Sequence, residues 1–349
     1  MLLVYLRLDN LKVTISIFYK IQQKGKLQKV NLTYQVPRVT TYQNVKEVLK
    51  AEFQMSDRLL LKLKKLQKIY LNHQCVYVHH PILPGDVIIC DLNDEEDNTN
   101  IVPTSIPLDI LYEDEAYLVV NKPAGIPVHP SMEHYTDSLS NGIRFYFDQI
   151  GLKKKIRPIN RLDKDTSGIV LFAKNEYIQE CLAKQMKSNK FMKKYIAIVN
   201  GRLEQKSGTI NLPIDRKENS IIERCISQNG KTAITHYKVI TLQSLFQNYF
   251  RFQNMYPHKQ RLNNCNNFSD FDIVECTLET GRTHQIRVHF ASIGHPLLGD
   301  TLYGSASPFI ARQALHAYEI SFIHPITQKL VSYIAPIPED FYPFMIKNF

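Results

Sequence analysis

One stretch of the chain joins a polar turn to an apolar strand and reads Asn160-Arg161-Leu162-Asp163-Lys164-Asp165-Thr166-Ser167-Gly168, followed by apolar residues 169–173. The Thr-Ser-Gly segment predicts a turn, and the apolar run predicts a buried strand. A carboxylate just before such a strand is held by rigid structure and can still face a cleft, as a nucleophile or general base requires. Because a lone aspartate beside a Ser-Gly turn is more often a turn or capping residue, Asp163 needs further support.

Asp165 lies two residues after Asp163 and raises the alternative of a glycosidase-type pair of carboxylates. Two carboxylates so close in the chain cannot easily flank a sugar from opposite sides. A hydrolase using both would usually call for a metal-binding carboxylate cluster, which the sequence does not provide. Both readings are therefore disfavoured.

A second polar cluster runs from residue 278 to residue 289 and contains Arg282 at a strand–helix junction. We expect a helix over 283–292, capped by Thr280 or Thr283. The planar fork of Arg282 could pair with a buried carboxylate.

Two histidines of this cluster, His284 and His289, are five positions apart. This spacing is poor for two metal ligands on one helical face, and no thiolate or third ligand lies in register. We therefore expect no metal site and interpret each histidine as an ordinary hydrogen-bonding residue.

Length and composition favour two domains and a polyanionic partner. The chain has 349 residues, 44% of them hydrophobic, and a formal net charge of +10. Such a balance favours nucleic acid or a membrane surface as a partner. Its six cysteines are far apart, which favours reduced thiols. No signal peptide and no apolar run of transmembrane length are expected.

Four regions follow one another along the chain. Residues 1–40 alternate apolar and polar positions and predict a hairpin-like extension. Residues 41–92 predict a compact α/β unit, and the polar, acidic residues 93–105 predict a linker. Residues 106–349 mix strand-like and helix-like segments, which predicts an α+β domain with a mixed, mainly antiparallel sheet.

Within the compact unit, Asn44 and Ser56 can cap two successive helices, the second reaching about Lys68. Short strands are expected at 69–72, 75–79 and 87–92.

The second of these helices carries a basic face made of Arg58, Lys62 and Lys65, opposite a leucine face. Residues 58–68 hold five basic side chains and no acid. A charge run is usually a solvated surface, but the absence of acids here favours phosphate contact. We expect these three residues to bind RNA, and the unit resembles the S4-type RNA-binding module.

Five segments in order resemble the RluA-type family of RNA pseudouridine synthases, in the branch with an N-terminal S4-like module. The resemblance spans roughly residues 106–338. The matching segments are Ile110–Glu115 and Leu118–Gly125 with His129-Pro130, Arg161–Asp163 with Thr166–Gly168, Lys194–Ala197 with Gly201, Thr280–His289 with Gly294–Pro296 and Gly299-Asp300, and Leu315–Ala317 with Phe322 and His324-Pro325.

The resemblance implies the pseudouridine synthase fold and a role for each matching residue. Asp163 would be the catalytic aspartate, Tyr195 would contact the target uracil, and Arg282 would pair with Asp163 and keep it ionised. Arg161 would enter the RNA where the target base leaves its stack, and Arg287 is expected to contact RNA.

We therefore expect an isomerase that converts uridine in structured RNA to pseudouridine without any cofactor or metal, since the reaction has no redox step or group donor. Ribosomal RNA of the large subunit is the expected substrate, with tRNA as an alternative. The expected protein is a cytoplasmic monomer that does not bind membranes. The alternative is a non-catalytic RNA-binding or ribosome-assembly protein of the same fold, which would have lost one of the three catalytic residues.

The sequence departs from the family pattern at two places. Asn160 stands where the family usually has His, and we expect it to donate a hydrogen bond with changed positioning. Residues 243–270 predict an inserted loop between two strands.

Overall fold

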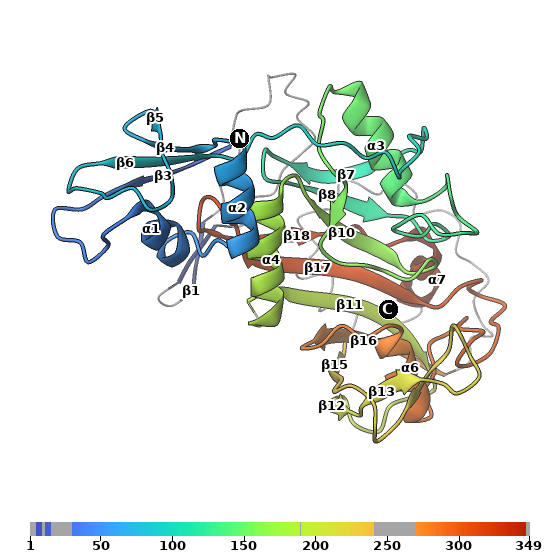
Figure 1. Ribbon diagram of the computed structural model, residues 1–349. Coiled ribbons are helices and arrows are strands. Elements are labelled where there is room, and N and C mark those ends of the chain that lie inside the picture. The colour runs from blue at the N-terminus through green and yellow to red at the C-terminus, as the bar shows by residue number, and fades with distance from the viewer. Residues whose placement is uncertain (1–4, 9–10, 15–29, 189, 241–269, 347–349) are drawn as a thin grey trace.

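The computed structural model describes residues 5–8, 11–14, 30–188, 190–240 and 270–346. A small unit of four strands and two helices lies beside one large sheet (Figure 1). Residues 15–29 of the predicted N-terminal hairpin, and all but the last residue of the inserted loop at 243–270, lie outside the described residues. Strands β1 (Tyr5–Leu8) and β2 (Leu11–Thr14) pair antiparallel.

The small unit is a four-stranded antiparallel sheet in the order β3-β6-β4-β5, with two helices. Its elements are β3 (Asn31–Gln35), α1 (Val45–Ala51), α2 (Asp57–Lys65), β4 (Ile69–Leu71), β5 (Gln74–Cys75) and β6 (Val87–Asp91). Strand β3 falls in the stretch expected to form a separate hairpin, yet it pairs with β6. Residues 31–35 therefore belong to the same sheet as β6 rather than to a separate hairpin.

Both predicted helix caps of the small unit are confirmed. The side chain of Asn44 accepts from the N–H of Glu47 at 3.1 Å, and that of Ser56 accepts from the N–H of Leu59 at 3.1 Å. These bonds satisfy N–H groups that a helix leaves free in its first turn. Helix α2 ends at Lys65, three residues earlier than predicted, and β5 covers only the start of the strand expected at 75–79.

The large sheet has ten strands, eight of them in the order β12-β15-β16-β11-β17-β10-β8-β7, with β18 on β17 and β9 on β10. Its strands are β7 (Asp109–Glu113), β8 (Tyr117–Lys122), β9 (Arg157–Pro158), β10 (Ser167–Ala173), β11 (Met192–Asn200), β12 (Ser207–Asn211), β15 (Ile234–Val239), β16 (Phe271–Leu278), β17 (Leu315–Ile323) and β18 (Leu330–Ile334). Only β10 and β17 pair in parallel. The predicted α+β class and the mainly antiparallel sheet are confirmed.

The remaining elements are α3 (Leu139–Gln149), α4 (Glu176–Lys187), β13 (Ile214–Arg216), β14 (Arg224–Ile226), α6 (Gln285–Ser292), η2 (Glu339–Phe341) and α7 (Tyr342–Ile346). Helices α3 and α6 pack on one face of the sheet, and α4 packs on the other. Strand β10 is buried along its whole length between these layers, which explains why the run at 169–173 has no polar position.

Helix α4 also lies against α2 of the small unit (Figure 1). One hydrophobic cluster includes Leu59 and Leu63 of α2 together with Tyr177 and Leu182 of α4. The two parts of the chain thus share an apolar core.

Candidate active site

Asp163 lies in a tight turn that ends where β10 begins. The N–H of Thr166 donates to the carbonyl of Asp163 at 3.1 Å. Gly168 has a φ of +111°, and a Cβ at this position would collide with the backbone of Ala317 on the parallel strand β17. Only glycine lets the two strands approach here, so the end of the turn is fixed. The side chain of Asp163 remains 25% exposed.

Asn160 ties the segment before Asp163 to β10. Its Nδ2 donates to the carbonyl of Ile169 at 2.9 Å, and its Oδ1 accepts from the N–H of Leu171 at 2.9 Å. The buried amide therefore does what a neighbouring strand would do, which holds this segment in a fixed register. The expected donor function is confirmed, and Asn160 also supplies an acceptor. The next residue, Arg161, is exposed.

An ion-paired arginine, Arg287 of α6, holds the Asp163 carboxylate. Its Nη1 donates to Oδ2 of Asp163 at 3.1 Å. Its Nε and Nη2 donate to the two oxygens of Asp300 at 2.7 and 2.8 Å. Burial by itself lowers the pKa of Arg287, but the two carboxylates outweigh it and raise that pKa. The arginine is thus a fixed cation between one buried and one partly exposed carboxylate.

The predicted partner of Asp163 was wrong. Arg282 is exposed, and its Nε donates to the carbonyl of Thr232 at 3.0 Å. Helix α6 starts at Gln285, so Arg282 lies in the preceding loop while Arg287 lies on the buried first turn. The expectation that Arg287 contacts RNA is not supported either. Its side chain is only 8% exposed and is already paired with Asp163 and Asp300.

The predicted caps of α6 were wrong as well. The residue before the helix is His284, which makes no side-chain cap. The side chain of Gln285 instead binds the loop before the helix. Its Oε1 accepts from the N–H of Arg282 at 2.9 Å and from the hydroxyl of Thr280 at 2.8 Å. These bonds order the loop that leads into Arg287.

Tyr195 lies on β11, next to the aspartate turn. The pairing of β11 with β17 shifts register between Lys194 and Tyr195, and such an irregularity redirects a side chain. Tyr195 is buried, and burial, followed by the charge of Asp163, raises the pKa of its hydroxyl. The phenol therefore remains protonated near neutral pH, close enough to Asp163 to feel its charge.

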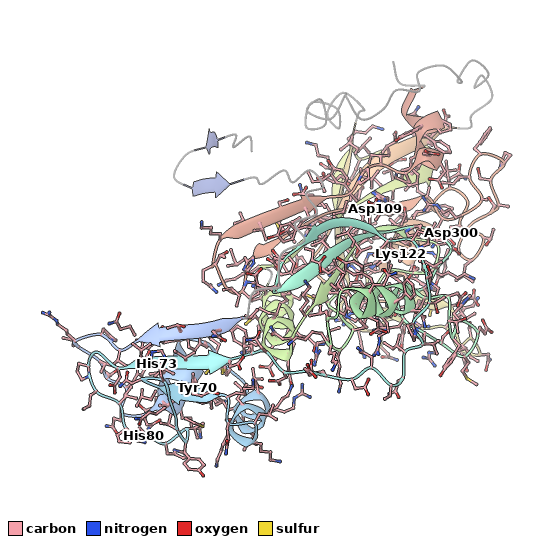
Figure 2. The ribbon with its side chains drawn as sticks, turned by 90° about the horizontal axis from the view of Figure 1, so that it is seen from above. Tyr70, His73, His80, Asp109, Lys122 and Asp300 are labelled. Atoms are coloured by element: carbon pink, nitrogen blue, oxygen red, sulfur yellow. The ribbon has the colours of Figure 1, made fainter. Side chains whose placement is uncertain are left out.

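Lys122, at the end of β8, donates hydrogen bonds to backbone carbonyls in and near the aspartate turn. Its Nζ donates to the carbonyls of Pro123, Ile126 and Lys164 at 2.8, 2.9 and 2.8 Å. Burial lowers the pKa of Lys122 to about 7. The three carbonyls match the three protons of an ammonium group, so these contacts fit the charged form. Figure 2 shows Lys122 and Asp300 in the same part of the large domain, far from His73 and His80 of the small unit.

Arg312 also donates to the aspartate turn, and the sequence did not point to this residue. Its Nη1 donates to the carbonyl of Asp165 at 3.0 Å, and its Nε and Nη2 pair with Asp340 at 2.7 and 2.9 Å. Arg312 lies just outside the matching segment that begins at Leu315, so only its closeness to that segment could have drawn attention to it.

His289 is the hydrogen-bonding residue that the sequence predicts. It is fully buried, with Nδ1 at 2.9 Å from the hydroxyl of Thr235 and Nε2 at 3.0 Å from the carbonyl of Leu212. Burial lowers its pKa, so the neutral ring is favoured. His284 differs, because its Nε2 lies 3.8 Å from Oδ2 of Asp163.

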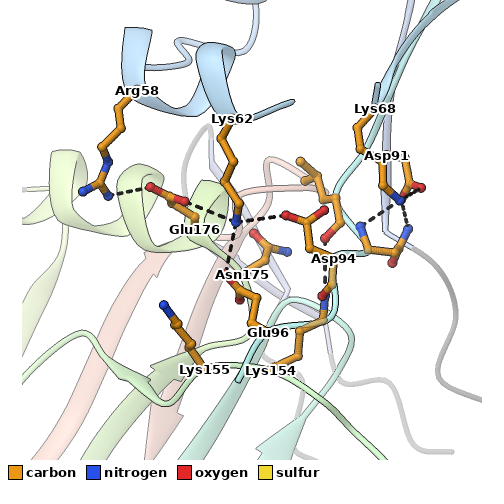
Figure 3. A network of polar contacts seen from close by, with 12 residues as sticks. Arg58, Lys62, Lys68, Asp91, Asp94, Glu96, Lys154, Lys155, Asn175 and Glu176 are labelled. Carbon is orange, nitrogen blue, oxygen red and sulfur yellow. Dashed lines mark hydrogen bonds and ion pairs between the residues drawn. The ribbon is translucent and has the colours of Figure 1, made fainter. Parts of the chain in front are cut away.

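The basic face of α2 meets acids from other parts of the chain (Figure 3). Lys62 contacts Asp94, Glu96 and Glu176 at 2.9, 3.1 and 3.5 Å, and Arg58 pairs with Glu176 at 2.5 Å. Arg58 is nevertheless 78% exposed, whereas Lys62 is 31% exposed. Lys65 is exposed. The absence of acids between residues 58 and 68 therefore did not mean that these cations were free, since Lys62 is paired with acids from other parts of the chain.

Within the described residues, no group of three or more His, Cys, Asp or Glu side chains is arranged to hold a metal ion. In the same part of the chain, no helix combines the length and apolar character needed to cross a membrane. Five cysteines there, Cys75, Cys90, Cys181, Cys225 and Cys276, are free thiols.

Known proteins are similar in sequence to this chain over most of its length. Residues 116–292 match the profile of the family described as RNA pseudouridylate synthase. An RNA pseudouridine synthase of Bacillus subtilis is 39% identical over 293 residues, covering 84% of this chain and 89% of the relative. The ribosomal large subunit pseudouridine synthase D of Xylella fastidiosa is 34% identical over 78% of both chains.

The fold agrees with a solved structure. Human RNA pseudouridylate synthase domain containing 1 matches with a TM-score of 0.52 and 24% identity, covering 70% of this chain and 88% of the human one. This match confirms the expected fold, and the sequence matches confirm the expected isomerase. The chain belongs to the RluA-type family of RNA pseudouridine synthases.

Proposed function

We propose that Asp163 is the catalytic aspartate, that Tyr195 contacts the target uracil, and that Arg287 takes the place expected for Arg282. One observation carries this proposal. The fork of Arg287 is occupied by buried Asp300, while in the described part of the chain Arg287 is the one group that donates to the Asp163 carboxylate. A carboxylate that is held by one oxygen and partly exposed is positioned yet available to react.

The reaction breaks the N-glycosidic bond of uridine and rejoins the base to the sugar through C5. Asp163 can add to the base or assist at the sugar. Tyr195 keeps its proton near neutral pH because burial and Asp163 raise its pKa, so its hydroxyl can donate a hydrogen bond to the uracil, and it can take up the C5 proton only after it has given away its own. The isomerisation needs no oxidant and no group donor, so we propose that no cofactor takes part.

The target base must leave its stack before it reaches Asp163, at a cost on the order of a few kcal/mol. Support for a role of Arg161 comes from its exposure and from its place two residues before Asp163. We propose that this side chain enters the RNA.

For the substrate, we propose ribosomal RNA of the large subunit, with the small unit acting as an S4-like RNA-binding module. Support comes from the net charge of +10 and from relatives that are named large subunit pseudouridine synthases. Exposed Arg58 and Lys65 remain candidates for phosphate contact, while Lys62 is excluded from the proposal by its internal ion pairs. The proposal also holds that the protein acts as a monomer in the cytoplasm.

The direct test is to map pseudouridines in the RNA of cells with and without the gene, and then to treat transcripts of the affected RNA with purified protein. We expect one or a few uridines of large-subunit ribosomal RNA to lose the modification and the purified protein to restore it. Loss of sites in tRNA alone would replace the proposed substrate, and no change in any RNA would contradict the proposed function.

A further inference from the structure

His284 occupies a backbone conformation that is uncommon for residues other than glycine. Its φ and ψ are 59° and 18°, in the left-handed region, at the residue directly before α6. Non-glycine residues there cost free energy and often lie at functional sites. Its side chain is 11% exposed and is directed toward Asp163 rather than toward solvent.

A chain of hydrogen bonds reaches the other nitrogen of this ring. The backbone N–H of Arg224 donates to the hydroxyl oxygen of Tyr303 at 2.8 Å. Nδ1 of His284 lies 2.8 Å from the same oxygen. The hydroxyl accepts from Arg224 and keeps its own proton, which it can donate to Nδ1. In this arrangement the neutral imidazole carries its proton on Nε2.

The protonated nitrogen faces the aspartate. Nε2 lies 3.8 Å from Oδ2 of Asp163, the oxygen that also accepts from Arg287. Burial lowers the pKa of His284, the charge of Asp163 and that of Asp300 oppose this, and those of Arg287 and Arg224 add to it. The neutral ring is favoured, so a donor faces Asp163 without a second cation beside Arg287.

We propose that His284 is a positioning residue for Asp163, whose Nε2–H supplies a second hydrogen bond to the carboxylate when RNA occupies the site. This inference rests on the proposed role of Asp163. A movement of about 1 Å would bring Nε2 into hydrogen-bond range of Oδ2. Two donors on one carboxylate oxygen, one charged and one neutral, fix the direction in which the other oxygen points.

Two amide variants separate this role from a structural one. The nitrogen of Gln lies as many bonds from Cβ as Nε2 of His, whereas the amide atoms of Asn lie where Nδ1 lies. His284→Gln keeps a donor toward Asp163, and His284→Asn keeps only the contact with Tyr303. Asn also adopts the left-handed conformation more readily than Gln, so a purely structural role predicts that His284→Asn is the more active variant.

The measurement is single-turnover pseudouridine formation with saturating purified enzyme, together with RNA affinity. We expect His284→Gln to keep its rate within about threefold of the wild type and His284→Asn to lose about tenfold or more, with RNA affinity unchanged in both. Equal rates in the two variants, or a faster His284→Asn, overturn the inference.

Tyr303→Phe provides a second readout. It keeps the ring but removes the hydroxyl that fixes the tautomer, so we expect it to slow the wild-type enzyme severalfold and to have little further effect on His284→Gln. Additive effects of the two substitutions overturn the inference. Asp163→Asn in the same assay distinguishes the two proposals. If that variant is active, the proposed catalytic role of Asp163 is wrong. If it is inactive but His284→Asn is as fast as His284→Gln or faster, only the role of His284 is wrong.

Discussion

Two clusters in this enzyme pair carboxylates with cations, but they differ in whether a carboxylate stays exposed. At the candidate active site, Arg287 is shared by Asp300, which is fully buried, and Asp163, which is 25% exposed. Between the small unit and the large domain, Lys62 and Arg157 surround Glu96, which is 10% exposed, with Arg157 at 2.6 Å. The first cluster leaves a carboxylate accessible, and the second leaves none.

The difference shows what makes a carboxylate available for chemistry. Glu96 pairs with Lys62 of the small unit, as Figure 3 shows. It also pairs with Arg157 of the large domain, so its charge serves to dock one part of the chain on another. Asp163 receives the third donor of an arginine whose fork is already occupied. Breaking either cluster should therefore have distinct consequences: lost catalysis in one, and lost docking in the other.

Among substitutions of the cations in these clusters and on α2, the largest expected effect comes from Arg287→Met, with Arg282→Met as the matched control. We expect the first variant to lose pseudouridine formation by about a hundredfold or more, because Asp163 loses its partner. The second should stay within a few fold, because among the described residues the side chain of Arg282 donates a hydrogen bond only to the carbonyl of Thr232.

Arg287→Met also leaves Asp300 buried without its partner, which costs on the order of 3–5 kcal/mol. Thermal unfolding must therefore be measured alongside activity, and Arg287→Lys, which keeps a charge, separates lost stability from lost chemistry. Loss of activity in Arg282→Met with an active Arg287→Met would reverse the assignment of the two arginines.

The second prediction concerns acid stability of the docked small unit. Burial by itself raises the pKa of Glu96, but hydrogen bonds and charges of Arg157 and Lys62 outweigh it and lower the pKa from 4.5 to about 2. A lowered pKa stabilises the fold above the unfolded value, and this contribution of roughly 3 kcal/mol is lost as pH falls from about 4.5 toward 2. Limited proteolysis between the two parts should accelerate over that range.

Glu96→Gln is the control for this pH dependence. The variant should be less stable at pH 7, and its stability should depend less on pH between about 4.5 and 2 than that of the wild type. If both proteins lose stability in parallel over this range, Glu96 is not the group that matters.

The smallest expected effect is that of Lys65→Ala on RNA binding. Removing one phosphate contact should weaken affinity by a few fold and reduce the slope of log affinity against log salt by about 0.9 or less. Lys50→Ala is the matched control on the same unit, because Lys50 is already paired with Asp57 at 2.8 Å. An equal change of slope in both variants would mean that α2 presents no specific contact.

Much of the fold could be predicted because local patterns and packing agree. The caps at Asn44 and Ser56, the apolar run of β10 and the strands at 195–199 and 273–278 all report local or nearest-neighbour physics. Strand β3 was placed in the wrong region because its partner, β6, lies more than fifty residues away, and no local signal encodes that pairing.

The candidate site shows the same limit at the level of side chains. Asp163 and Tyr195 were found from the resemblance, but the choice between Arg282 and Arg287 depends on where α6 begins. The helix begins at Gln285, directly after His284 in the left-handed conformation, and sequence spacing does not reveal that boundary. Lys62 was misjudged for a related reason: its acids come from residues 94, 96 and 176, outside its own helix.

The central claim is that Asp163 carries the chemistry, and one measurement tests it most directly. Pseudouridine formation and RNA binding are measured for Asp163→Asn and for Asp165→Asn, which removes a carboxylate two residues away in the same turn. The account predicts no detectable product and nearly normal RNA binding for Asp163→Asn, with activity within about tenfold of the wild type for Asp165→Asn. Product formation at the normal rate by Asp163→Asn would contradict it.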